Sequence, residues 1–137
     1  MALICLDTTA ISDLVRGQDR IKDRMGALES EGARFCTTSV NAYEALVGIE
    51  LHRSDRERAT YAERFDRMLA GMVVIPFGLE RARAASSKMA ALYGRGRPAS
   101  TMDLLTASTA RAAGCEAVLT RNGSQFRRIG LLTVIGY

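Results

Sequence analysis

The sequence predicts an α/β fold with a mainly parallel central sheet. Short apolar runs of the length and composition of strands buried on both faces recur along the chain. Between them lie stretches with helical periodicity and clear helix start and stop residues. At 137 residues, with 47% hydrophobic and 25% charged residues, residues 1–137 are expected to form a single domain with its own core.

The expected strands are residues 2–6, 34–38, 72–75, 117–120 and 131–135. The expected helices are residues 9–15, 19–30, 40–52, 55–71, 80–93 and 101–114. Thr8 or Thr9 is the expected cap of the first helix, and Ser39 that of the third. Residues 94–98, which hold two glycines and a proline, form the one expected flexible loop.

Three acidic residues stand almost alone in apolar sequence: Asp7, Glu44 and Asp103. A carboxylate buried among apolar neighbours is costly unless a cation or strong donors compensate it. Three such acids at the ends of elements therefore indicate a divalent metal site. Two structural alternatives remain open, since Asp7 could cap the first helix and Asp103 could be an acid favoured by the helix dipole.

Carboxylate oxygens are the ligands that Mg²⁺ or Mn²⁺ prefers. Magnesium usually takes one or two direct carboxylates, so the third acid would hold a water of the ion. Such an ion activates water and neutralises charge on a phosphate, which suits phosphodiester hydrolysis. Other sites lack their signatures: the chain has no phosphate-binding glycine motif, no serine elbow, and His52 as its only histidine.

Charge is distributed unevenly along the chain. Residues 1–80 carry 10 basic and 13 acidic residues, whereas residues 81–137 carry 9 basic and 2 acidic residues. A basic half near a metal site suits a polyanionic substrate, although arginines on solvated helix faces would explain it equally well. The three cysteines adjoin apolar runs and are expected to be buried free thiols of a cytoplasmic protein. We expect neither a signal peptide nor a membrane span.

Four segments together resemble the PIN domain, in particular the VapC-type toxin ribonucleases of type II toxin–antitoxin systems. They come in the family's order and at its spacing across nearly the whole chain. The segments are Leu-Asp7-Thr-Thr-Ala-Ile, Ser39-Val-Asn-Ala-Tyr-Glu44-Ala-Leu, Pro98-Ala-Ser-Thr-Met-Asp103-Leu-Leu-Thr-Ala-Ser, and Leu119-Thr-Arg-Asn122 followed by Phe126.

The resemblance implies a PIN-like three-layer sandwich whose central five-stranded parallel sheet has the order 3-2-1-4-5. That order would bring Asp103 to the pocket of the other acids. It also implies a Mg²⁺- or Mn²⁺-dependent endoribonuclease with Asp7, Glu44 and Asp103 as metal ligands. Asn122 takes the place of a fourth catalytic acid, and because its amide is neutral, a second metal would be held weakly.

Thr8 and Thr120 are expected to support the acids through their hydroxyls, and Arg95, Arg97 and Arg121 to contact RNA phosphates. The resemblance further implies a homodimer inhibited by a small antitoxin, which would carry the operator-DNA-binding domain. One alternative is a catalytically silent PIN-like domain that binds RNA or a protein partner. Another is a PIN nuclease of RNA maturation or DNA repair.

Overall fold

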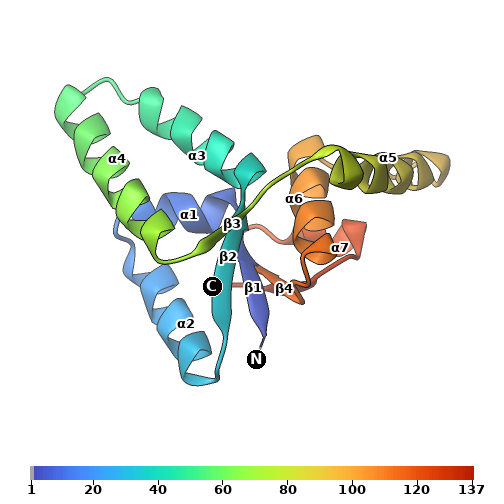
Figure 1. Cartoon of the computed structure of the whole chain (residues 1–137), viewed down its shortest axis with the longest axis horizontal. Coiled ribbons are helices and arrows are strands. Elements are labelled where there is room, and N and C mark those ends of the chain that lie inside the picture. Colours follow the sequence, from blue (N-terminus) through green and yellow to red (C-terminus); the bar gives the residue numbers. More distant parts are fainter. Residues whose placement is uncertain (1) are drawn as a thin grey trace.

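The computed structural model describes residues 2–137, and within them five strands form one all-parallel sheet (Figure 1). The strands are β1 (Leu3–Leu6), β2 (Arg34–Thr38), β3 (Val73–Ile75), β4 (Ala117–Leu119) and β5 (Thr133–Ile135). Their order is β3-β2-β1-β4-β5. The predicted α/β class and the strand order 3-2-1-4-5 are confirmed.

The described residues also form seven helices. They are α1 (Thr8–Val15), α2 (Asp19–Ser30), α3 (Ser39–Glu50), α4 (Asp55–Ala70), α5 (Leu79–Gly94), α6 (Thr101–Ala112) and α7 (Ser124–Ile129). Six of them match predicted helices to within a few residues at each end. The helix α7 lies outside the prediction because its 6 residues are too few to show a helical period.

The predicted caps of α1 and α3 are one or two residues late, and for α1 the cap is Asp7, the alternative that the sequence left open. The cap of α1 is Asp7, whose side chain accepts the backbone N–H of Ala10, and not Thr8 or Thr9. The cap of α3 is Thr38, which accepts the N–H of Asn41, and not Ser39. In each case the strand passes directly into the helix, so the last extended residue becomes the cap.

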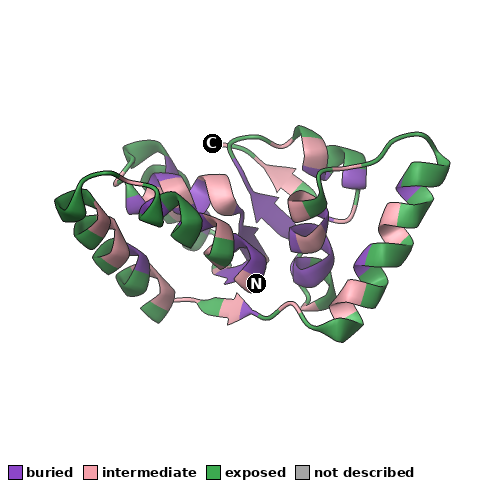
Figure 2. Cartoon of the chain, turned by 90° about the horizontal axis from the view of Figure 1, so that it is seen from above, coloured by how far each residue is buried: buried purple, intermediate pink, exposed green. Residues whose placement is uncertain are grey.

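The sheet separates two apolar cores. Its central strands are buried, and they are drawn purple in Figure 2. Ile4 and Leu6 of β1 face the core shared with α1 to α4, whereas Cys5 between them faces the core shared with α5, α6 and α7. This alternation gives the three-layer arrangement that the sequence predicts. Cys5, Cys36 and Cys115 are free and buried, as predicted.

The helix α5 projects beyond the sheet and packs chiefly against α6 (Figure 1). The chain then returns so that α6 begins near the carboxyl edge of the sheet and leads down to β4. At the opposite edge, the N–H of Glu116 donates to the carbonyl of Leu3 at 3.1 Å. This excursion places Asp103, in the first turn of α6, on the side of Asp7. No helix of residues 2–137 has both the length and the apolar character needed to cross a membrane.

Candidate active site

Asp7 lies at the junction of β1 and α1, where its side chain is held from three directions. Its Oδ1 accepts the N–H of Ala10 at 3.0 Å and the hydroxyl of Thr9 at 2.7 Å. Its Oδ2 accepts the hydroxyl of Thr120 at 2.6 Å. Burial raises the pKa of Asp7, and these hydrogen bonds oppose the shift, that of Thr120 most strongly. The side chain is therefore a fixed, desolvated carboxylate, and Thr120 is one of the three residues that hold it.

Glu44 lies in the second turn of α3, half-buried and facing the start of α1. Its Oε1 accepts the hydroxyl of Thr8 at 2.6 Å. The same hydroxyl accepts a hydrogen bond from Nδ2 of Asn41 at 3.1 Å. Thr8 thus orients the carboxylate of Glu44.

Asn41 is the centre of a buried polar network that the sequence-based site does not include. It is 1% exposed, accepts the hydroxyl of Thr38 at 2.6 Å, and donates to Thr106 of α6 at 3.0 Å. Thr106 lies three residues beyond Asp103, on the same face of α6. The network therefore joins the helices that carry Glu44 and Asp103. A signal was present in the sequence, because Asn41 lies three residues before Glu44 and so shares its helix face.

Asp103 lies in the first turn of α6. We call Asp7, Glu44 and Asp103 together the acidic cluster. Its pKa is raised, first by burial and then by repulsion from Asp7 and Glu44, while a hydrogen bond from Ser100 opposes the shift. The carboxylate of Asp103 therefore lies close enough to those of Asp7 and Glu44 to be repelled by both. Asp7 caps α1 and also belongs to the acidic cluster. Its role as a helix cap is therefore compatible with a role as a metal ligand.

The segment after β4 runs beside Asp7. The backbone N–H of Asn122 donates to the hydroxyl of Thr120 at 3.0 Å, which places the backbone of this exposed residue beside the Thr120 that supports Asp7. The guanidinium of Arg121 is paired with Asp13 of α1, Nη1 to Oδ1, at 3.0 Å. Arg121 is predicted to contact an RNA phosphate. In the structure, Nη1 of its guanidinium is already bonded to Asp13.

Arg95 and Arg97 lie on the turn between α5 and α6 and are exposed. Their backbone N–H groups bond to α5 carbonyls. Within residues 2–137, neither side chain makes a hydrogen bond or an ion pair. The structure therefore does not join these two arginines to the acids, and their contact with phosphate stays a prediction.

The donor set fits a hard divalent cation, with one restriction. All the donors are oxygens, and a cation would relieve the repulsion that raises the pKa of Asp103. However, no three histidine, cysteine, aspartate or glutamate side chains of the described chain are arranged to chelate one ion. An ion at this place would thus bind one or two carboxylates directly and reach the remaining one through water, as magnesium commonly does.

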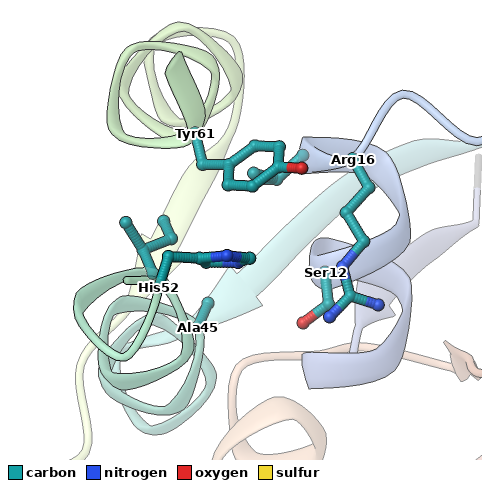
Figure 3. A pocket seen from close by; sticks show the side chains of 7 residues that line it. Ser12, Arg16, Ala45, His52 and Tyr61 are labelled. Atoms are coloured by element: carbon teal, nitrogen blue, oxygen red, sulfur yellow. The ribbon is translucent and has the colours of Figure 1, made fainter. Parts of the chain in front are cut away.

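A small cavity of about 30 Å³ lies between α1, α3 and α4 (Figure 3). Ser12 and Arg16 face it from α1, and His52 and Tyr61 face it from beyond α3 and from α4. Ala45 also lines it, whereas the neighbouring Glu44 side chain bonds to Thr8.

Solved structures of similar fold include several toxin–antitoxin complexes. A chain of VapBC2 from Rickettsia felis, bound to a DNA fragment from its promoter, superposes with a TM-score of 0.83 at 19% identity, covering 98% of both chains. DNA-bound VapBC from Salmonella typhimurium gives 0.79 at 23% identity, with 99% of this chain and 98% of that one covered. FitAcB from Neisseria gonorrhoeae gives 0.80 at 22% identity, with 96% of each chain covered.

At these identities the superpositions establish the fold. Among curated proteins, none matches the sequence at a significant level. The sequence model of the PIN domain matches residues 4–132, a span that contains the acidic cluster and the segment after β4. The chain belongs to the PIN domain family.

Proposed function

We propose that this protein is a metal-dependent endoribonuclease that hydrolyses RNA phosphodiester bonds with an activated water molecule. The observation that supports the proposal is the approach of three acids from different elements. The adjacent residues Thr8 and Thr9 bond to Glu44 and Asp7, and the pKa of Asp103 is raised by burial and then by repulsion from both. Membership of the PIN family, whose domains are nucleases, supports a hydrolase. The basic character of residues 81–137 favours a polyanionic substrate.

Bound Mg²⁺ or Mn²⁺ would supply a Lewis acid that lowers the pKa of water and offsets charge on the phosphate. The chain's own residues keep the acids in place for it. Thr120 and Thr9 fix both oxygens of Asp7, and Thr8 fixes Glu44. Carboxylates held in this way need little reorganisation during the reaction, which is the main source of electrostatic catalysis.

Asn122 and the arginines complete the proposed site. The side-chain amide of Asn122 is proposed to hydrogen-bond a water of the ion. It adds no charge, so one tightly held ion is expected. Arg95, Arg97 and Arg121 are proposed to bind phosphates of the RNA through charge-assisted hydrogen bonds.

We further propose that the protein is the VapC-type toxin of a toxin–antitoxin pair, acting in the cytoplasm as a homodimer. Support comes from the similarity to chains of VapBC and FitAcB complexes. The partner would be a small antitoxin that blocks the acidic cluster and carries the DNA-binding domain for the operator. Three buried free thiols are consistent with a reducing compartment.

The deciding experiment incubates the purified protein with single-stranded and structured RNAs in Mg²⁺, in Mn²⁺ and in chelator. Asp7→Asn and Asp103→Asn test the cluster, and Asp23→Asn, an exposed α2 residue, is the matched control for the loss of one negative charge. We expect cleavage by the wild type and the control only, and only with a divalent ion. Cleavage that survives Asp7→Asn or the chelator would identify a contaminant.

Two further outcomes separate the alternatives. RNA binding without cleavage under every condition would favour a silent PIN-like binding domain. For the toxin role, expression of the wild type should arrest growth, and co-expression of a small reading frame directly upstream should relieve the arrest. Cleavage without growth arrest would favour a nuclease of RNA maturation or DNA repair.

A further inference from the structure

Asp13 is a buried carboxylate that the proposed chemistry does not use. It lies on α1 and is only 4% exposed. Its Oδ1 accepts Nη1 of Arg121 at 3.0 Å, and its Oδ2 accepts the hydroxyl of Tyr137 at 2.7 Å. A carboxylate this buried requires such partners, and here both of its oxygens are fixed in direction.

The partner of Asp13 is itself adjacent to the acidic cluster. The backbone N–H of Arg121 donates to the hydroxyl of Thr9 at 3.0 Å, and that hydroxyl donates to Asp7 at 2.7 Å. Thr9 and Asp13 are four residues apart and so share one face of α1. This face of α1 therefore makes two hydrogen bonds to Arg121: Thr9 bonds to its backbone N–H, and Asp13 bonds to its guanidinium.

The guanidinium of Arg121 is held at one end only. Its side chain is 52% exposed, and within residues 2–137 its Nε and Nη2 have no hydrogen-bond partner. Arginine binds phosphate through a planar fork of N–H groups, and a fork whose orientation is already fixed loses less entropy on binding. An arginine whose backbone bonds to Thr9 beside Asp7, and whose guanidinium is fixed by Asp13 with other donors free, has the arrangement of a preorganised phosphate ligand.

We propose that Asp13 is a positioning residue for the reaction. It clamps Arg121 so that the free guanidinium N–H groups meet a phosphate of the bound RNA, and Tyr137 fixes the orientation of the Asp13 carboxylate. The inference rests on the proposed function, because the phosphate is that of the RNA substrate.

A purely electrostatic role for Asp13 predicts the opposite sign. Removing a negative charge beside the site would strengthen attraction to RNA, so KM would fall. Removing a clamp frees Arg121 to adopt many rotamers, so KM would rise. The direction of the change in KM therefore separates the two roles.

The experiment measures kcat and KM on a fluorogenic RNA for Asp13→Asn, Arg121→Met and the double variant. We expect KM to rise by about 3- to 10-fold in each single variant, the effect of one weakened charge-assisted contact. The double variant should resemble Arg121→Met, and kcat should change by less than about twofold. Asp23→Asn and Arg20→Met, at exposed α2 positions, are the matched controls.

A fall in KM for Asp13→Asn, or additive effects in the double variant, would overturn the inference. The order of the Arg121 side chain, measured by ¹⁵Nε relaxation, gives a readout that does not depend on activity. Asp13→Asn should loosen Arg121, and Tyr137→Phe, which removes a single hydrogen bond, should do so more weakly in a folded protein. An equally rigid Arg121 in both variants would also overturn it. A wild type that neither binds nor cleaves RNA would refute the proposed function. The ¹⁵Nε relaxation of Arg121 would then be the one test of whether Asp13 holds its side chain.

Discussion

Replacing Asp103 with asparagine should stabilise the metal-free protein at neutral pH while abolishing cleavage. The pKa of Asp103 is raised by burial and by repulsion from Asp7 and Glu44. Because the folded state disfavours the charged form, stability falls as the pH rises above 3.8, the ordinary pKa of the group, and through its raised folded value. Asparagine does not titrate, so its advantage should be absent at lower pH and grow through that window.

The expected gain in the free energy of unfolding of Asp103→Asn is small but measurable. Two unit charges about 7 Å apart repel by roughly 2 kcal/mol at an effective dielectric of about 20, and solvent screening of a partly exposed group reduces this to about 1 kcal/mol for each pair. Loss of the favourable dipole interaction in the first turn of α6 offsets roughly 0.3–1 kcal/mol. The net gain is about 1 kcal/mol, or a Tm higher by roughly 3–5 °C.

Thermal and urea unfolding across pH, in chelator and with Mg²⁺ or Mn²⁺, would measure this effect. The divalent ion should stabilise the wild type by binding the native cluster, and stabilise Asp103→Asn much less. Asp23→Asn is the control for a charge removed at an exposed position. A variant that is less stable than the wild type at neutral pH in chelator, or an advantage independent of pH, would refute the claim that the carboxylates repel one another.

Three further substitutions test the surroundings of the cluster. Thr120→Val removes the hydroxyl that donates to Asp7. The rate of RNA cleavage should drop at least about 10-fold, and the free energy of unfolding should fall by roughly 1–2 kcal/mol. Thr120→Ser, which keeps the hydroxyl, should restore both. Asn41→Leu removes the amide that bonds to Thr8, Thr38 and Thr106 and leaves the hydroxyl of Thr38 without its acceptor. It should cost about 1–3 kcal/mol in urea unfolding, and near-neutral stability would show that the network is dispensable. Gly123→Ala would place a Cβ 2.5 Å from Cγ1 of Val134, so the Tm should fall by the equivalent of about 1–3 kcal/mol, and adding Val134→Ala should recover most of it.

The strands and most helices were predictable because each carries a local signal. The run before Asp7 is apolar and ends at an acid, and residues 34–38 combine Phe35 and Cys36 with β-branched threonines. The helices show their period and their boundary residues. The caps were not predictable to the residue, because a strand that continues straight into a helix leaves no loop to mark the change. The six residues of α7 are likewise too short for a period to appear.

The acids could be singled out, but their surroundings could not. Asp7, Glu44 and Asp103 stand out because apolar neighbours make an isolated charge conspicuous. Asp13 does not, since α1 continues into charged sequence and its burial depends on Arg121, 108 residues away. Pairings of this kind arise from tertiary packing and leave no trace in the spacing of either residue.

The polar network around Asn41 has a consequence for local stability. It ties α3 to the start of α1 and to α6 at the middle of the molecule, whereas α5 buries only Ala85 and Leu92 and packs chiefly on one neighbour. Segments with few buried contacts open first in native-state fluctuations. The backbone amides of α5 should therefore exchange with solvent long before those of α3. Asp7, Glu44 and Asp103 should keep their positions while α5 opens locally and closes again.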